Sequence, residues 1–459
     1  MFIKTKKNLA FFMNKITIMN ETLLKENLDK LCYKFADETN KKKRGVVFTN
    51  EKTINDLLKL LPENVWTNKN LKWLDPGAGV GNIMIYIYFK LMKNLKIKNE
   101  EKRRKHILEN MLFFIEIKDE YVNEIKEIFC YDKYELNIHN GSFVKMNIEE
   151  DNTNIYDNKQ FFDIIVTNPP YQKPNKDGGS SAKPLYHLFI DKSLEILKEG
   201  GYLVAIHPFT WRRKSREIKL IDNLLQYQIV YLYTNNNFTE FNKSAIHINY
   251  YLLEKKKIYK KTICDNYFNH KYYHSELYLT NKLEFLPILL TEETLSIIIK
   301  MKDKTTEKFN IKLESKLSST QSPDNISLEL KEDYQYQNFH TYSIKKDKNI
   351  FKYTKDKHPS HDKNKIIMNF KGGYNIFRPF IDYGTMGITD NALYTEFKTE
   401  KEANKLMNLF NSKLFKFILM ITSYNYAPNK KIEFHIINTL SISDNYELTK
   451  NELELIDNI

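Results

Sequence analysis

Short apolar runs and longer segments with helical spacing alternate along the first half of the chain. Apolar positions spaced as on one helix face predict helices over residues 83–91 and 184–199. Apolar or alternating runs predict strands at residues 71–74, 111–116, 136–140, 161–167, 202–206, 229–233 and 244–252. We expect the last of these strands to be partly antiparallel. Alternation of strands and helices indicates an α/β fold, a Rossmann-like sheet with helices on both faces.

This rhythm ends near a lysine-rich stretch at residues 255–261. Beyond it, segments rich in Tyr, Asn, His and Lys show no clear order of strands and helices. A chain of 459 residues is too long for one ordinary hydrophobic core. We therefore predict an N-terminal extension at residues 1–40, the α/β domain at 41–255 and a mixed α+β domain at 256–459.

The sequence Asn168-Pro169-Pro170-Tyr171 directly follows the strand predicted at 161–167. Two prolines remove two backbone donors and stiffen the chain, so that the Asn168 amide and bare carbonyl oxygens are held at the end of the strand. In open α/β sheets, ligands bind at this carboxyl edge. An amide oxygen, a carbonyl oxygen and an aromatic ring suit a planar amino group, because the oxygens accept its protons while the ring stacks on the base.

A glycine-rich turn at residues 75–82 connects the first strand to the first helix. It begins at Asp75, and Gly77 and Gly79 let the backbone pass close under a ligand, beside the free N–H groups of the helix N-terminus. Many nucleotide-binding folds share such a turn, and a merely tight connection is the alternative interpretation. The next strand ends in Glu116, at a distance along the chain that suits a carboxylate binding ribose hydroxyls.

In chain order, the glycine turn, the acidic strand end, a third strand end at Ser142-Phe143 and Asn-Pro-Pro-Tyr resemble the S-adenosylmethionine-dependent adenine-N6 DNA methyltransferases. Phe48-Thr49 resembles that family's first cofactor motif, and its place before the glycine turn is the gamma-type order. The resemblance covers residues 40–255. It departs from the family at Ser142, where Asp is usual, and a hydroxyl bonds an adenine amino group less strongly than a carboxylate does.

The resemblance implies a methyltransferase sheet, S-adenosyl-L-methionine as cofactor, and methyl transfer to N6 of an adenine flipped out of double-stranded DNA. Asn168 and Pro169 would accept the two N6 protons, within a catalytic motif that includes Pro170 and Tyr171. Tyr171 and either Phe238 or Phe241 would stack on the flipped base. Residues 256–459 would be the target-recognition domain. The implied cofactor-binding residues are Phe48, Thr49, Asp75, Gly77, Gly79, Glu116, Ser142, Phe143 and Asn168.

The net charge of +13 is consistent with a polyanionic partner, although an A/T-rich genome would also supply many lysines. Arginine is scarce, and three of the seven arginines lie close together at Arg212, Arg213 and Arg216. The planar guanidinium of Arg donates paired hydrogen bonds that match phosphates and guanine edges. We therefore expect these three arginines, and Arg378 in the second domain, to contact DNA. His207 follows the strand at 202–206 and is interpreted as structural, because adenine methylation needs no base.

The sequence shows no metal site, because its three cysteines are scattered and form no metal-ligand spacing. Pro323-Asp324 and the nearby Glu329 resemble a metal-nuclease pattern, but the gap is too short for the paired strands that such a site needs. No apolar run approaches the length of a membrane span. We therefore expect a soluble, cytoplasmic monomer within a restriction-modification system, whose endonuclease, if one exists, is a separate protein.

Other functions share parts of this pattern. Protein-glutamine methyltransferases also carry Asn-Pro-Pro-Tyr but normally lack a large basic C-terminal domain. RNA-adenine methylation is a second enzymatic alternative. A catalytically inactive DNA-binding module is a third, which the intact motif at residues 168–171 disfavours and Ser142 weakly favours.

Overall fold

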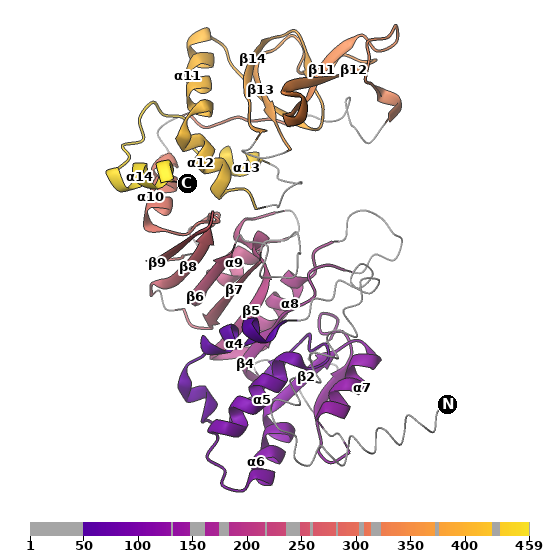
Figure 1. The fold of residues 1–459 in the computed structure, drawn as a ribbon, viewed down its shortest axis with the longest axis vertical. Coiled ribbons are helices and arrows are strands. Elements are labelled where there is room, and N and C mark those ends of the chain that lie inside the picture. Colours follow the sequence, from indigo (N-terminus) through magenta and orange to yellow (C-terminus); the bar gives the residue numbers. More distant parts are fainter. Residues whose placement is uncertain are drawn as a thin grey trace.

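The protein was analysed as a computed structural model, which describes residues 49–129, 132–146, 161–173, 183–215, 218–235, 248–257, 260–280, 283–302, 307–313, 323–371, 376–424 and 432–458. Figure 1 shows two stacked parts: a large sheet with its helices, and above it the C-terminal strands and helices. No helix in the described ranges is both long and apolar enough to cross a bilayer.

A nine-stranded sheet with the strand order β3-β2-β1-β4-β5-β7-β6-β8-β9 forms the first part. Strands β3, β2, β1, β4 and β5 run parallel, and β7 lies antiparallel between β5 and β6. The strands are β1 Trp73–Asp75, β2 Leu112–Glu116, β3 Asn137–Asn140, β4 Phe162–Thr167, β5 Leu197–Pro208, β6 Gln228–Asn235, β7 Ile248–Glu254, β8 Thr262–Phe268 and β9 Lys271–Leu277.

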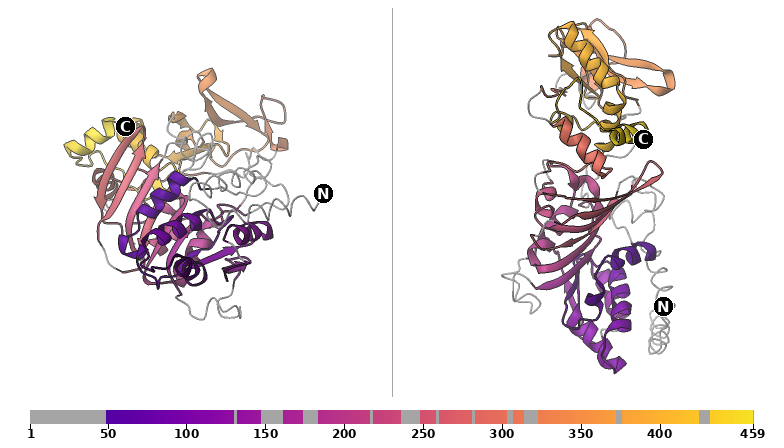
Figure 2. Two further views of the ribbon diagram at one scale, coloured as in Figure 1. Left: turned by 60° about the horizontal axis from the view of Figure 1, so that its bottom comes forward. Right: turned by 90° about the vertical axis from the view of Figure 1, so that its left-hand side faces the viewer.

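Helices cover both faces of this sheet, as the apolar pattern predicts. Successive residues of β4 point to opposite sides: Ile164 and Val166 pack into one core, with α4, α5 and α7, and Ile165 packs into the other, with α8 and α9. The right-hand view of Figure 2 shows the sheet nearly edge-on. The helices are α4 Glu51–Lys59, α5 Asn82–Asn94, α6 Glu100–His106, α7 Asp119–Ile128, α8 Tyr186–Ile196 and α9 Leu220–Leu224, and the short helices are η2 Glu63–Trp66, η3 Ile107–Met111 and η4 Phe209–Arg212.

The predicted α/β fold is confirmed, and so are its seven strands, including the antiparallel one at β7. The boundary predicted at residue 255 is wrong for the sheet. Strand β8 pairs with β6 and β9 pairs with β8, so the sheet continues to Leu277. Alternating hydrophobicity is weak in β9, whose residues are mostly exposed or half-buried, and this hid the last strand from the apolar pattern.

The C-terminal part is mixed α+β, with two small sheets of strand order β10-β12-β11-β15 and β14-β13-β16. Its core includes Phe209 of η4 and Phe268 of β8, so the two parts share apolar packing. Its elements are α10 Glu292–Met301, η5 Pro323–Asn325, β10 Ile326–Ser327, β11 Tyr336–Ser343, η6 Ile344–Lys346, β12 Lys348–Thr354, β13 Asn364–Asn369, β14 Phe380–Tyr383, β15 Gly387–Ile388, β16 Ala392–Glu396, α11 Glu400–Asn411, α12 Lys413–Ile421, α13 Phe434–Ile437 and α14 Lys450–Asn458.

Candidate active site

A cavity of about 250 Å³ opens at the carboxyl ends of β1, β2, β3 and β4. Parallel strands end at a common edge of the sheet, so residues far apart in the sequence meet there. Predicted site residues that line the cavity are Thr49, Asp75, Gly77, Gly79, Glu116, Ser142, Phe143, Asn168, Pro169, Pro170 and Tyr171. The structure therefore brings together the predicted catalytic and cofactor residues that fall within its described ranges.

The glycine turn after β1 forms the floor of the cavity. Gly79 has φ +56° and a Cβ there would meet no atom within 4 Å, so its backbone faces open space. Gly81, with φ +83°, is the N-cap of α5, and a Cβ there would approach Phe129 and Ile125 at 3.3 and 3.4 Å. Both conformations favour glycine. At Gly77, Pro170 of the Asn-Pro-Pro-Tyr motif lies 3.7 Å from the position of a Cβ.

Glu116 at the end of β2 holds this turn. Its Oε2 accepts a hydrogen bond from the Gly79 N–H at 2.8 Å, and its Oε1 accepts one from the Lys118 N–H at 2.9 Å. Burial raises the pKa of Glu116, and the two backbone N–H groups oppose that shift. Each carboxylate oxygen accepts more than one hydrogen bond, so Glu116 keeps acceptor capacity for a hydroxyl-bearing ligand in the cavity.

Asp75 lies at the end of β1, only 1% exposed. Burial raises its pKa to about 7, and the Glu116 carboxylate adds to that rise, while the hydrogen bond from the Gly77 N–H opposes it. The Gly77 N–H donates to Asp75 Oδ1 at 3.1 Å. Two carboxyl groups thus lie under the cavity, where they favour a cationic ligand.

Asn168 extends from β4 into the cavity wall. Its Nδ2 donates to Thr49 Oγ1 at 2.8 Å, and its Oδ1 is shielded from solvent. Tyr171 is 7% exposed and packs in the core beside α4 and α5, and its burial raises the pKa of the phenol. The Leu185 N–H donates to Tyr171 O at 2.9 Å, which joins the motif to the start of α8.

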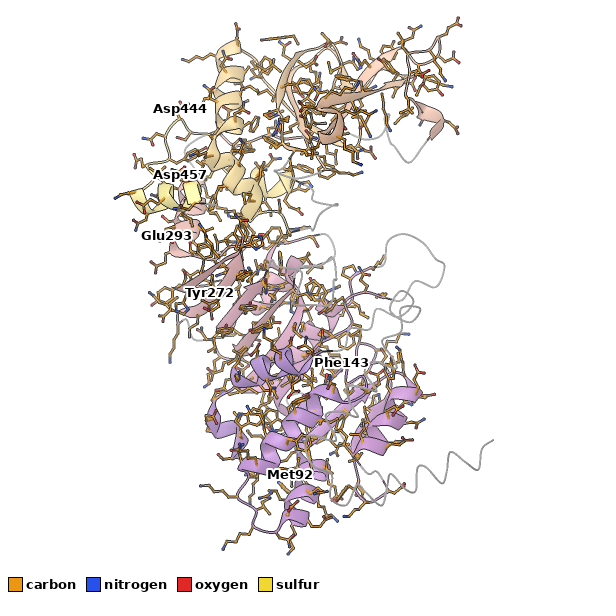
Figure 3. The ribbon with its side chains drawn as sticks, in the orientation of Figure 1. Met92, Phe143, Tyr272, Glu293, Asp444 and Asp457 are labelled. Atoms are coloured by element: carbon orange, nitrogen blue, oxygen red, sulfur yellow. The ribbon has the colours of Figure 1, made fainter. Side chains whose placement is uncertain are left out.

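Ser142 and Phe143 follow the third strand, β3, and both line the cavity. Phe143 is 2% exposed, and its ring lies 5.5 Å from that of Phe189 on α8. Figure 3 labels Phe143 in the lower part of the molecule, among the large sheet and its helices. Ser142 uses its backbone oxygen to accept hydrogen bonds from Lys145 and Met146, so it begins a turn at the cavity edge.

Cavity residues that were not predicted from the sequence include Asn82, Ile117, Tyr121 and Phe189. Asn82 is the first residue of α5 and donates to Thr49 O at 2.5 Å. Ile117 follows Glu116 and is 63% exposed, which is unusual for a large apolar side chain beside a cavity. Its position directly after an acidic strand end is a signal that could have identified it.

Arg212 was predicted to contact DNA, and the structure contradicts this. Its side chain is fully buried, and its guanidinium donates to Pro287 O at 3.1 Å, to Ile288 O at 3.2 Å and to Thr234 Oγ1. Burial lowers its pKa to about 10. The reason is that the segment at residues 285–288 covers the end of β5, which leaves no path to a phosphate.

Arg213 is also engaged within the protein. It forms an ion pair with Glu433 at 3.1 Å, and 21% of its side chain is exposed. Its guanidinium also lies over the ring of Tyr424. Arg378 is exposed, as a DNA contact requires. Arg216 lies outside the described residues.

His207 is structural, as predicted. It is fully buried, stacks on Tyr186 with ring centroids 4.7 Å apart, and is hydrogen-bonded to Tyr251. Burial lowers its pKa to about 3, so it is neutral near pH 7. Phe48 and the two candidate base-stacking residues, Phe238 and Phe241, lie outside the described residues. No group of three His, Cys, Asp or Glu side chains in the described ranges comes together as a metal site.

Comparison with known proteins places this site in context. Residues 82–238 match the family model of the Eco57I restriction-modification methylases. An uncharacterized adenine-specific methylase of Mycoplasma pneumoniae (strain ATCC 29342 / M129 / Subtype 1) is 28% identical over an alignment that covers 38% of this chain and 57% of that protein. The chain thus spans just over half the length of this curated relative.

Two solved structures share the fold. The type IIL restriction-modification enzyme MmeI, solved in complex with DNA, has a TM-score of 0.53 at 12% identity, with 82% of this chain and 65% of that chain covered. The ATP-dependent type ISP restriction-modification enzyme LlaBIII, bound to DNA, has a TM-score of 0.56 at 12% identity, with 94% and 41% covered. At these identities the similarity shows the fold alone.

Proposed function

We propose that this chain, whose residues 82–238 match the Eco57I restriction-modification methylases, is a DNA methyltransferase that transfers a methyl group from S-adenosyl-L-methionine to N6 of adenine. The observation that carries the proposal is the convergence of Asn168-Pro169-Pro170-Tyr171 with the glycine turn and Glu116 around one cavity. That arrangement sets a hydrogen-bond acceptor for an amino group beside a site for a nucleoside.

The residues around the cavity fit this cofactor. Glu116 offers carboxylate acceptors for two ribose hydroxyls, and the open backbone at Gly79 admits close approach of a ligand. The carboxyl groups of Asp75 and Glu116 complement a cationic methionine moiety. Ile117 and Phe143 offer apolar contacts for a purine. When bound, S-adenosyl-L-methionine supplies an electrophilic methyl group that is already activated.

The protein's task is to position a weak nucleophile. The N6 lone pair of adenine is delocalised into the ring, and inside a duplex N6 is out of reach, so the base must leave the stack. Asn168 Oδ1 and Pro169 O would accept the two N6 protons and localise the lone pair toward the cavity. Because Asn168 Oδ1 is shielded from solvent, the entering base must displace neighbouring atoms to reach it. Fixed acceptors in a preorganised site supply most of the rate enhancement.

The base would be held by stacking, worth about 1–3 kcal/mol for each base. Tyr171 would provide one face, and Phe238 or Phe241 the other. Tyr171 is packed against the core, so its ring is held rigidly and only part of its surface is available. Residues 256–459 would read the target sequence, apart from the strands β8 and β9, which belong to the large sheet. We expect the protein to act as a monomer on double-stranded DNA, with any cognate endonuclease on a separate chain.

Incubation of the purified protein with labelled S-adenosyl-L-methionine and, in parallel, plasmid DNA, RNA or a protein substrate tests the proposal. We expect label in N6-methyladenine after nucleoside digestion, and none with Asn168→Ala. Label confined to RNA, or to glutamine in a protein substrate, would replace the proposed substrate. DNA binding without label in any of the three substrates would show an inactive DNA-binding module.

A further inference from the structure

A hydrogen bond joins the catalytic motif to a residue far upstream in the chain. Asn168 Nδ2 donates to Thr49 Oγ1 at 2.8 Å, across 119 positions of sequence. Thr49 is 9% exposed, and both residues line the cavity. We infer that Thr49 is a positioning residue, which fixes the amide plane of Asn168 so that its oxygen accepts the protons of the substrate amino group. The inference rests on the proposed function.

A hydrogen-bond partner at the nitrogen fixes the direction in which an asparagine oxygen faces. The terminal torsion of Asn is broad, so the backbone alone does not set the plane of the amide. The two ends of that plane differ chemically, because the oxygen accepts and the nitrogen only donates. A rotated amide would present N–H groups to the N–H groups of adenine. With Nδ2 hydrogen-bonded to Thr49, the opposite end of the amide plane is the oxygen, which is the acceptor that an amino group requires.

Thr49 is itself held in place by two neighbouring elements. Asn50, which follows it, is the N-cap of α4 and accepts a hydrogen bond from the Thr53 N–H at 2.8 Å. Leu57 and Leu58 of α4 are fully buried against the sheet, so this helix is a firm support. Asn82 Nδ2 donates to Thr49 O at 2.5 Å.

These bonds form a continuous chain from Asn82 through Thr49 to Asn168. Asn82 begins α5 immediately after the glycine turn, so the floor of the cofactor cavity and the catalytic amide share one support. The sequence interpretation assigned Thr49 to cofactor binding. In the structure the Thr49 hydroxyl is hydrogen-bonded to Asn168 of the Asn-Pro-Pro-Tyr motif, and the two roles predict different kinetics.

Two variants of the full-length protein separate these roles. Thr49→Val keeps the shape of the side chain but removes the hydroxyl, and Thr49→Ser keeps the hydroxyl. We expect Thr49→Val to lower kcat for DNA methylation about tenfold, the effect of one lost hydrogen bond, with the Kd for S-adenosyl-L-methionine unchanged. Thr49→Ser should restore kcat. In an Asn168→Ala background, Thr49→Val should have no further effect, because the group it positions is gone.

A readout that needs no activity comes from the protein labelled with ¹⁵N only at asparagine. The side-chain amide signal of Asn168 is identified by its loss in Asn168→Ala. We expect that signal to shift in Thr49→Val and to keep its position in Thr49→Ser.

Each contrary outcome has a distinct meaning. A weaker Kd for the cofactor with unchanged kcat in Thr49→Val would make Thr49 a cofactor ligand and overturn the inference. Wild-type kcat in Thr49→Val, or an unmoved Asn168 signal, would also overturn it. Absence of DNA methylation by the wild-type protein would overturn the proposed function, while the amide signal would still decide whether Thr49 holds Asn168.

Discussion

Two neighbouring strands of the large sheet end at the same edge but lead to opposite environments. Strands β4 and β5 are parallel, with Thr167 beside Ala205. After β4, Asn168 lines the cavity. After β5, the chain continues through η4. Arg212 at the end of η4 is fully buried, and its guanidinium donates hydrogen bonds to the carbonyl oxygens of Pro287 and Ile288. We call the first the pocket edge and the second, residues 209–213 with the segment 285–288, the junction edge.

The difference lies in what covers each edge. At the junction edge, Leu286 N–H donates to Arg212 O at 2.8 Å, and Ile288 N–H donates to Ile421 O at 2.8 Å. Tyr424 adds a hydrogen bond to Leu286 O at 2.6 Å. Segments from the C-terminal part therefore close this edge. Whether an arginine at this edge can contact DNA or instead supports the structure therefore depends on whether segments distant in the sequence cover it.

The largest effect is expected at the pocket edge. Asn168→Ala removes an acceptor that acts mainly in the transition state, so kcat should fall on the order of 10²–10³-fold. The Kd for S-adenosyl-L-methionine, measured by calorimetry, should stay near the wild-type value. Near-normal turnover would show that the motif is not catalytic.

At the junction edge, the expected effect is on stability rather than activity. Arg212→Met leaves buried oxygen atoms without their charged donor, which should lower the free energy of unfolding by about 3 kcal/mol. Lys214→Met is the matched control, because Lys214 forms an exposed pair with Asp222 and should change stability by less than about 1 kcal/mol. Denaturant unfolding measures both. A flatter salt dependence of DNA binding in Arg212→Met would restore the DNA-contact interpretation.

The cofactor side of the pocket edge is tested at Glu116. In Glu116→Gln, an NH₂ group replaces one of the two oxygens that hold the Gly79 and Lys118 N–H groups. We expect affinity for S-adenosyl-L-methionine to fall about 10- to 100-fold, the cost of a charge-assisted hydrogen bond. Glu135→Gln, at an exposed position before β3, is the control. Equal affinity in both variants would contradict the assignment of Glu116 to the ribose.

Asp75 gives the pocket edge a pH dependence. The folded pKa of Asp75, about 7, lies above its ordinary value of 3.8, so the folded protein binds the proton more tightly than the unfolded chain does. This tighter proton binding stabilises the fold fully below pH 4. The stabilisation is lost as the pH rises toward 7, by up to about 1.4 kcal/mol of unfolding free energy for each pH unit. In Asp75→Asn, denaturant unfolding should show a shallower decline over this range. The same decline in both proteins would place the titration elsewhere.

The smallest effect is expected at Arg378. This exposed arginine lies near Tyr342 in the C-terminal part, with its guanidinium 5.7 Å from the ring. If it contacts a phosphate, Arg378→Gln should reduce the slope of log K against log salt by about 0.9 for DNA binding. Arg104→Gln on α6, where Arg104 pairs with Glu100, is the control and should keep the wild-type slope. A slope unchanged in Arg378→Gln would remove it from the interface.

Much of the fold and the pocket edge could be predicted because their signals are local. Apolar runs define β1 to β7, and a glycine with positive φ or a pair of prolines marks a turn by its own backbone chemistry. Strands β8 and β9 were missed: the buried positions of β8 include the polar residues Asp265 and Asn266, and the exposed residues of β9 do not alternate clearly. Asn82 and Phe189 were missed because each reads as an ordinary helix residue until the helix is docked.

The sequence by itself determined the order of the strands' motifs, and hence which residues stand at the carboxyl ends of β1 to β4. Parallel pairing then places those ends at one edge, so little further information was needed to assemble Asp75, Glu116 and Asn168. Only the tertiary structure decided that Thr49 holds the Asn168 amide and that Arg212 is buried beneath residues 285–288. Both outcomes depend on contacts between segments that are distant in the sequence. The spacing of apolar residues reports local helix or strand structure and does not show which distant segments come into contact.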